Sequence, residues 1–213
     1  MYDWIFFDLD GTLTDPGEGI TNSVAYALKK EGIEPPERQQ LYRFIGPPLV
    51  DSFMKYYDFS KERAHRAVEE YREYFRERGI FENRVYDGVP KLLTSLTAQG
   101  KKLVLATSKP ELFAIRILEH FDLSRFFTFV AGALMDETRT AKGDVIAYAL
   151  QSCGITDRSR VLMVGDRLHD VKGAQQCGLD SVGVLFGYGS REELTEAGAT
   201  YIAETVEEIE QFV

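Results

Sequence analysis

The sequence predicts an α/β protein with a Rossmann-like parallel sheet, helices on both faces of that sheet, and a helical domain inserted near the N-terminus. Three observations lead to this prediction. From about residue 85 onward, apolar runs alternate with segments of helical periodicity. The apolar runs are nearly continuous, as is typical of strands that are buried on both faces. Residues 16–85, in contrast, contain helical patterns and no convincing strand.

Five apolar runs are expected to form the strands of the sheet. The first is Trp4–Phe7, and the others are 101–107, 126–132, 160–166 and 181–186. Three segments between them have helical periodicity and end at glycine or aromatic residues, namely 110–121, 142–154 and 170–179. Alternation of strands and helices in this way favours a parallel sheet.

The segment that follows the first strand is interpreted as an inserted α-helical cap domain. Three stretches in it are helical by pattern, at 18–32, 49–58 and 60–79. We expect hinges near 15–17 and 86–88, where turn residues cluster. The predicted core domain therefore comprises residues 1–15 and 86–213, and the predicted cap comprises residues 16–85.

Composition limits the classes of partner. The 213 residues include 34 acidic and 25 basic side chains, which gives a formal net charge of -9. Such a chain repels polyanions, so nucleic acid polymers and anionic membranes are poor candidates as partners. The same charge repels a small phosphate, so any anion site must be built locally. We expect a small-molecule partner and a monomer or weak homodimer.

The two cysteines and the N-terminal residues indicate a reducing compartment. Cys153 and Cys177 suggest neither a disulfide framework nor a zinc site, and Cys177 is expected to be a small core residue. The N-terminus has no basic region, Asp8 interrupts its apolar run, and no stretch approaches the length of a membrane span. A cytoplasmic location is therefore expected.

Two carboxylates, Asp8 and Asp10, follow the first strand. Side chains at positions i and i+2 of a strand point to the same side, so the two acids converge if the chain stays extended across Leu9. Gly11 permits a sharp turn after them, and Thr12 offers a hydroxyl or a backbone donor. Because such carboxylates repel one another, a hard cation such as Mg²⁺ fits this site. A solvated acidic turn would explain the same residues taken alone.

Polar residues also end the second strand. Thr107 and Ser108 precede a helix that is expected to begin at Pro110, since proline suits the first helical position. The free amides of a helix start and two hydroxyl groups could hold a phosphate. Capping of that helix by Ser108 is the alternative.

Lys142, Asp166 and Asp170 extend the pattern. Lys142 opens a helix, where the helix dipole disfavours a cation, so it makes sense there if it faces an anionic site. Asp166 ends a third apolar run, and Asp170 lies near the next helix start, which it could merely cap. In a parallel sheet Asp8 and Asp166 share one edge, and ligands bind at the carboxyl ends of such strands.

Together, in this order, these motifs resemble the haloacid dehalogenase-like phosphatase superfamily over the whole chain. The resemblance implies that Asp8 is the nucleophile and that Asp10 is the general acid and base. It further implies a phosphate site formed by Gly11, Thr12, Thr107, Ser108 and Lys142. The implied Mg²⁺ site is formed by Asp8, Asp10 (through its backbone carbonyl) and Asp166, with Asp170 either assisting at the metal or positioning Lys142. The dehalogenases of the superfamily lack the second aspartate, so Asp10 argues for phosphoryl chemistry.

The substrate is less well defined by this resemblance. The helical insertion is similar to the cap of phosphoglycolate phosphatases and β-phosphoglucomutases, whereas stretches such as "FIGPPLVDSF" and "GDRLHDVKGA" look closer to bacterial 5′-nucleotidases. Glycine after Lys142, where many of these relatives have proline, also favours the nucleotidase-like branch. We expect a phosphatase of small phosphate monoesters that works through an aspartyl-phosphate. Phosphoglycolate phosphatase and phosphosugar mutase are the alternatives.

Further candidate residues lie in the predicted cap and next to the motifs. Arg43, Gly46, Pro47 and Lys55 are expected to face the reaction centre from the cap, although Gly-Pro-Pro is also a rigid turn between helices. Lys109 and Arg167 could add positive potential or be surface charges. Gly187-Tyr188-Gly189 is interpreted as a mobile loop at the rim of the site.

Overall fold

The computed structural model describes residues 1–136 and 138–213, and the chain divides into two compact units. Unit 1 comprises Met1–Thr14 and Val85–Val213, and unit 2 comprises Asp15–Arg84. Unit 1 contains the main sheet, whereas unit 2 is built from helices. None of the helices in the described part of the chain combines the length and apolar character needed to cross a membrane.

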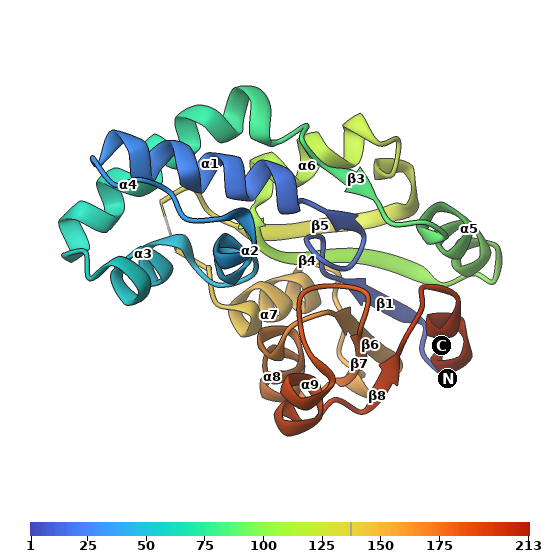
Figure 1. Cartoon of the computed structure of the whole chain (residues 1–213). Coiled ribbons are helices and arrows are strands. Elements are labelled where there is room, and N and C mark those ends of the chain that lie inside the picture. Colours follow the sequence, from blue (N-terminus) through green and yellow to red (C-terminus); the bar gives the residue numbers. More distant parts are fainter. Residues whose placement is uncertain (137) are drawn as a thin grey trace. The chain divides into compact units, whose positions relative to one another are not determined.

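The sheet of unit 1 has six parallel strands in the order β5-β4-β1-β6-β7-β8, as Figure 1 shows. The strands are β1 (Trp4–Phe7), β4 (Lys102–Pro110), β5 (Phe127–Ala133), β6 (Val161–Gly165), β7 (Asp180–Val184) and β8 (Tyr201–Ala203). β1 is central because Phe7 pairs with Leu105 of β4 on one side and with Val164 of β6 on the other. The predicted fold class is confirmed.

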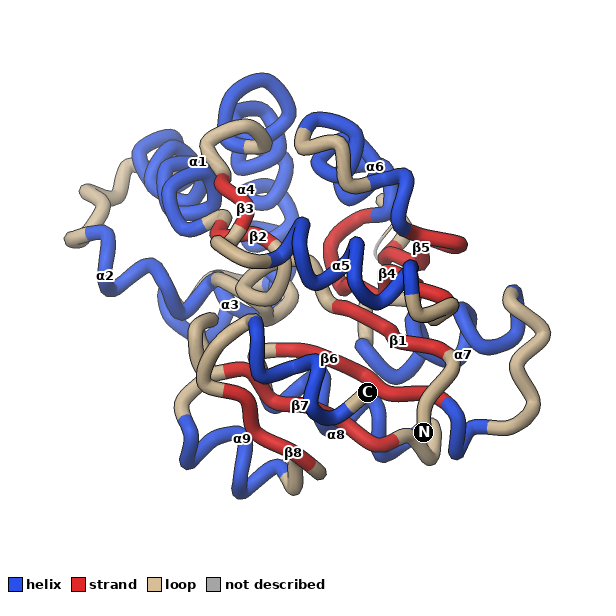
Figure 2. The backbone as a smooth tube through the Cα atoms, turned by 90° about the vertical axis from the view of Figure 1, so that its right-hand side faces the viewer, coloured by secondary structure: helices blue, strands red, loops and turns tan. Residues whose placement is uncertain are grey.

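Helices cover both faces of this sheet. On one face, α7 (Lys142–Ser152) and α8 (Leu168–Gln176) enclose a core that includes Phe6, Val104 and Met163. On the opposite face lies α5 (Val89–Ala98), which Figure 2 shows in front of the strands. The remaining helical segments of this unit are α6 (Glu111–His120), α9 (Arg191–Ala197), η3 (Ser124–Phe126), η4 (Arg158–Arg160) and η5 (Glu207–Phe212).

One strand end differs from the sequence prediction. β4 continues to Pro110 instead of ending at Thr107, and α6 begins at Glu111 instead of Pro110. Pro110 is extended, with φ -52° and ψ 129°, and it pairs with Ala133 of β5. A proline disfavours helical geometry in the residue before it, so Lys109 stays in the strand. This extension decides where the Lys109 side chain lies.

Unit 2 consists of helical segments, and the three helices predicted for it are present. They are α1 (Gly17–Lys30), α3 (Leu49–Tyr57) and α4 (Lys61–Tyr74), accompanied by α2 (Arg38–Leu41), η1 (Tyr42–Phe44) and η2 (Phe75–Gly79). Gly19 and Gly79 let α1 and η2 approach closely, because a Cβ on Gly19 would lie 1.9 Å from the Gly79 carbonyl oxygen. The short strands β2 (Thr14–Asp15) and β3 (Arg84–Val85) pair at the limits of this unit.

Candidate active site

The central strands of unit 1 bring the predicted strand-end residues to one edge of the sheet. Asp8 directly follows β1, Asp166 directly follows β6, and Thr107 lies in β4. Because β1 pairs in parallel with both β4 and β6, the three residues are at the same edge. The prediction that Asp8 and Asp166 share an edge is therefore confirmed.

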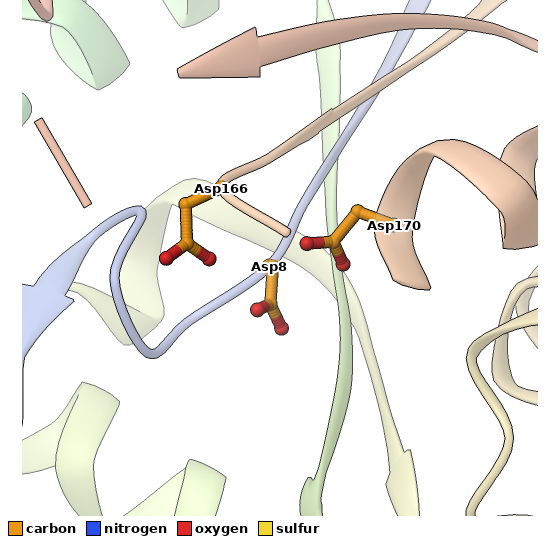
Figure 3. A group of neighbouring side chains, drawn as sticks. All are labelled: Asp8, Asp166 and Asp170. Carbon is orange, nitrogen blue, oxygen red and sulfur yellow. The ribbon is translucent and has the colours of Figure 1, made fainter. Parts of the chain in front are cut away.

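Three buried carboxylates form the centre of this edge. Asp8, Asp166 and Asp170 are 7%, 0% and 2% exposed, and each offers an oxygen such that all three lie within 4.8 Å of one another. Figure 3 shows the carboxylates of Asp166 and Asp170 on either side of Asp8, with Asp170 extending from α8. Such an all-oxygen group has the composition that Mg²⁺ prefers.

Lys142 is the cation that faces two of these acids. It is the first residue of α7, as predicted, and its Nζ lies 2.6 Å from Asp8 Oδ1 and 2.8 Å from Asp170 Oδ1. It also donates a hydrogen bond to the carbonyl oxygen of Ala106 at 2.9 Å. An ammonium group has three donors, so these contacts use all of them. Burial alone would lower the pKa of Lys142, but the carboxylates of Asp170 and Asp8 raise it above its ordinary value.

Asp10 occupies a different position from the one expected. The chain bends at Leu9, and β1 has already ended at Phe7, so the two acids are not at i and i+2 of a regular strand. A tight loop replaces the extended chain: the Leu9 carbonyl accepts N–H groups from Leu13 and Thr14 at 2.9 and 3.0 Å. The Asp10 carboxylate lies outside the group of three acids that could share a metal.

Lys109 contacts Asp10. Its Nζ lies 2.8 Å from Asp10 Oδ2, and the two side chains are 6% and 12% exposed. The interpretation of Lys109 as a surface charge is therefore wrong. Its burial results from the three extra residues of β4, which the sequence pattern does not reveal.

The loop at Gly187-Tyr188-Gly189 packs against Asp166, although the sequence suggested a mobile rim. The backbone N–H of Tyr188 donates a hydrogen bond to Asp166 Oδ2 at 2.7 Å. A Cβ on Gly187 would lie 2.3 Å from the Gly11 carbonyl oxygen, and one on Gly189 would lie 2.0 Å from the Asp166 carbonyl oxygen. In the sequence, the glycines on both sides of Tyr188 are the feature that indicates this close approach of the backbone.

The start of α8 fixes Asp170. The Arg167 N–H donates a hydrogen bond to Asp170 Oδ2 at 3.0 Å, so Asp170 closes the helix start as well as facing Lys142. Glu193 supports the same turn, since its Oε1 lies 2.8 Å from Arg167 Nε and accepts the Leu168 N–H at 2.9 Å. No local pattern in the sequence indicates Glu193, because it lies on α9 and meets Arg167 only in the fold.

Charge in the site is unbalanced toward the negative. Burial, together with the charges of Asp170 and Asp8, raises the pKa of Asp166 well above its ordinary value. Burial raises the pKa of Asp170 to about 6, although the Lys142 ammonium opposes the shift. Burial likewise raises the pKa of Asp10, against the opposing effect of Lys109.

A divalent cation fits this charge distribution. Four carboxylates face two lysines, which leaves two negative charges at full ionisation. Among the described residues, Oδ1 of Asp10 and Oδ1 of Asp166 are buried without a hydrogen-bond partner. Unpartnered buried oxygens are costly unless a ligand or ion satisfies them. The acids at this edge therefore have the charge and the free oxygens for a hard divalent metal.

The residues expected to hold phosphate lie at the same edge. The Thr107 hydroxyl accepts the Lys109 N–H at 3.2 Å, and the buried Thr12 hydroxyl has no hydrogen-bond partner within the described ranges. Gly11 adopts φ +83°, and a Cβ there would lie 2.1 Å from Asp166 Oδ2. Ser108 does not cap α6, because that helix has no side-chain cap, so the capping alternative is wrong.

The four candidate cap residues belong to unit 2. The Arg43 guanidinium lies 4.2 Å from the ring centre of Tyr56, and the Lys55 ammonium lies 5.4 Å from the same ring. Gly46 has φ +101° and, with Pro47, links η1 to α3. Their role toward a substrate stays a prediction.

Comparison with known families gives one family match. A sequence model described as haloacid dehalogenase-like hydrolase matches residues 5–184, which is most of the chain. That range includes the four aspartates and the two lysines of the site, which are Asp8, Asp10, Lys109, Lys142, Asp166 and Asp170.

Individual relatives cover nearly the full length. The chain is 49% identical to the 5′-nucleotidase of Pseudomonas aeruginosa, over 91% of this chain and 87% of that protein. It is 38% identical to the tyrosine-protein kinase PtkA of Mycobacterium tuberculosis, over 97% of this chain and 71% of that protein. The crystal structure of a predicted phosphatase from Clostridium acetobutylicum superposes with a TM-score of 0.97 at 48% identity, covering 100% and 98% of the two chains.

Proposed function

The chain belongs to the haloacid dehalogenase-like hydrolase family, and we propose that it is a Mg²⁺-dependent phosphatase of small phosphate monoesters, with 5′-nucleotides as the favoured class. The observation that carries the proposal is the buried contact of Lys142 with Asp8 and Asp170 beside Asp166. The 49% identity to a 5′-nucleotidase supports the substrate class.

Asp8 is the proposed nucleophile. A carboxylate can attack phosphorus only if its repulsion from the phosphate dianion is relieved. Asp8, Asp166 and Asp170 would hold Mg²⁺, with the Asp10 carbonyl as a further ligand implied by the family resemblance. When bound, the ion would neutralise charge on the phosphate and in the transition state. Lys142 supplies a fixed positive charge 2.6 Å from Asp8 Oδ1, which orients the nucleophile and offsets its negative charge.

Asp10 is the proposed general acid and base. As an Asp8 oxygen bonds to phosphorus and the bond to the leaving oxygen breaks, Asp10 gives that oxygen its proton. In the second step Asp10 takes a proton from water, which attacks phosphorus and releases inorganic phosphate and the free Asp8 carboxylate. Such proton transfer contributes about 10²–10⁴-fold to a rate. Gly11, Thr12, Thr107 and Ser108 are proposed to hold the phosphoryl oxygens.

Unit 2 is the proposed cap, and it would select among phosphate esters. The candidate residues are Arg43, Gly46, Pro47 and Lys55, which remain predictions from the sequence. A cap that closed over the reaction centre would favour a small-molecule substrate over a nucleic acid polymer or a membrane. The net charge of -9 also disfavours polyanions, because it repels them.

A phosphotransferase is the second candidate. It is favoured by the 38% identity to a protein named tyrosine-protein kinase. Such an enzyme would share the transfer to Asp8 but would pass the phosphoryl group to a hydroxyl acceptor instead of water. A phosphosugar mutase would do the same with a sugar hydroxyl, so release of inorganic phosphate separates these candidates from a phosphatase.

The test is phosphate release with Mg²⁺ from a panel of nucleoside 5′-monophosphates, phosphoglycolate, hexose phosphates and phosphotyrosine. We expect the nucleotides to be hydrolysed best. Asp8→Asn should lower kcat by more than about 10³-fold, because removal of a nucleophile disables the whole reaction. The exposed Asp144 provides the matched control, and Asp144→Asn should retain activity.

Other outcomes change the proposal in defined ways. A preference for phosphoglycolate would keep the chemistry and change the substrate class. Transfer of a phosphoryl group from a phosphate donor to a tyrosine or sugar hydroxyl, without release of inorganic phosphate, would favour the phosphotransferase. Equal release by the wild type and by Asp8→Asn would contradict the proposed nucleophile.

A further inference from the structure

We propose that Lys109 is a positioning residue that fixes the Asp10 carboxyl group so that Oδ1, and not Oδ2, exchanges the proton with the leaving oxygen. This inference rests on the proposed function, in which Asp10 is the general acid and base. From the sequence pattern alone, Lys109 could be a source of positive potential or a surface charge. The contact with Asp10 gives it a specific role.

The two oxygens of Asp10 have different environments. Oδ2 lies 2.8 Å from the Lys109 ammonium, whereas Oδ1 is buried and has no hydrogen-bond partner among the residues described. An oxygen that is held by a cation has little freedom to approach a substrate. The free Oδ1 is therefore the atom available for proton transfer.

The backbone of Lys109 is itself fixed. Its N–H donates a hydrogen bond to the Thr107 hydroxyl at 3.2 Å, and the next residue, Pro110, pairs with Ala133 in the sheet. A Cβ on Gly132 would lie 2.8 Å from the Lys109 carbonyl oxygen, so β5 packs closely against this residue. Lys109 thus reaches Asp10 from a rigid strand end and not from a flexible surface loop.

Lys142 does not duplicate this role. Its three donors are used by Asp8, Asp170 and the Ala106 carbonyl. The two buried lysines therefore have different roles: Lys142 orients the nucleophile, and Lys109 orients the general acid and base.

The expected consequence depends on the leaving group. When the P–O bond of an alkyl phosphate breaks, the leaving oxygen needs the proton from Asp10 Oδ1 to depart as an alcohol. A p-nitrophenolate departs without a proton, so it gains little from a well-placed acid. Without Lys109 the carboxyl group can rotate and exchange its oxygens, and alkyl esters should suffer most.

The experiment compares kcat/KM for adenosine 5′-monophosphate and p-nitrophenyl phosphate, because this ratio reports the step in which the ester bond breaks. For Lys109→Met we expect a loss of about 10²-fold with the nucleotide and less than about 10-fold with the aryl ester, in kcat more than in KM. Lys109→Arg keeps the charge and should recover part of the nucleotide activity. The exposed Lys172 provides the control, and Lys172→Met should change neither of the two kcat/KM values.

Two further measurements keep the outcome decisive. In an Asp10→Asn background, Lys109→Met should add little to the loss with the nucleotide, because residues that act through one another are not additive. If Lys109→Met does not fold by circular dichroism, the ratio of the two esters in Lys109→Arg decides, since partial misplacement should still penalise the nucleotide more.

Contrary results are distinguishable. An equal loss with both esters, or a loss confined to KM, would overturn the inference and leave the phosphatase intact. A wild-type protein that releases phosphate from neither ester would overturn the proposed function, and the inference with it.

Discussion

At the scale of single residues, the site is a problem of charge compensation. Lys142 holds Asp8 and Asp170, and Lys109 holds Asp10. Asp166 is held instead by the neutral N–H of Tyr188, while being completely buried. Of the four acids, Asp166 should therefore depend most on a bound cation.

Asp166→Asn should stabilise the metal-free protein at pH 8. Burial and the charges of Asp170 and Asp8 raise the pKa of Asp166, so the folded state binds this proton more tightly than the unfolded state does. Stability is then lost as pH rises from the unfolded pKa of about 4 through the folded value. Asparagine removes that loss, and we expect a gain of about 1 kcal/mol or more, which is a rise of about 2–4 °C in Tm.

Thermal unfolding with a chelator at pH 5 and pH 8 tests this. The gain should be smaller at pH 5, because less of this loss of stability has accumulated at that pH. A destabilised variant at pH 8 would show that the ionised Asp166 is already well satisfied without a metal.

The sequence could predict those site residues whose position is a local property. Asp8, Asp166 and Lys142 lie at the end of an apolar run or at a helix start, and both features can be read from a short window. Lys109 and Glu193 could not be assigned in this way. Their burial and their partners depend on strand length and on helix packing, which are set by the whole fold.

At the scale of elements, too, the sequence predicts what depends on a local pattern and misses what depends on the whole fold. The predicted strands are present because each buried run is nearly continuous in apolar residues. The three residues of β8 and the seven of α9 are too short to stand out by periodicity. β4 extends three residues beyond its predicted end, because Pro110 disfavours helical geometry at Lys109 and itself stays extended instead of opening α6.

The glycine loop after β7 is the element whose packing bears most directly on the three acids that could hold a metal. Gly187→Ala would put a Cβ 2.3 Å from the Gly11 carbonyl oxygen and 2.4 Å from Asp166 Cβ. Since backbone is on one side of this contact, the loop must move, and the Tyr188 hydrogen bond should weaken. We expect a destabilisation of about 1–3 kcal/mol and a loss of about 10-fold or more in apparent Mg²⁺ affinity.

Gly100→Ala separates the two effects. Gly100 has φ +78° with open space around its Cβ position, so alanine there carries backbone strain without touching the site. The Gly100→Ala variant should lose about 1 kcal/mol of unfolding free energy, and the dependence of its activity on Mg²⁺ concentration should not change. Activity measured against Mg²⁺ concentration for both variants provides the readout, and an unchanged dependence in Gly187→Ala would contradict a supporting role of the loop.

At the scale of the whole molecule, added salt should change the stability of the protein in two ways. It acts on the surface, where the net charge of -9 is carried, and on the buried acidic site. The surface charges respond to ionic strength in general, because any salt screens them. The buried acids respond to a cation that enters the site. These two contributions can be separated in one stability measurement.

MgCl₂ should raise the Tm of the wild type more than NaCl of equal ionic strength, and more at pH 8 than at pH 5. At pH 8 Asp170, with a pKa of about 6, is ionised and adds to the negative charge of the site, whereas at pH 5 it retains a proton that Mg²⁺ must displace. At about 100 times the dissociation constant, the ion should add about 2.7 kcal/mol to the free energy of unfolding.

The control for this effect is Asp166→Asn, which removes one of the three acids that could hold the ion. In that variant the advantage of MgCl₂ over NaCl should largely disappear, while the general salt effect on the surface charges persists. Equal stabilisation of the wild type by the two salts at pH 8 would mean that the three buried acids do not take up a divalent ion, and the metal-dependent chemistry proposed for Asp8 would have to be abandoned.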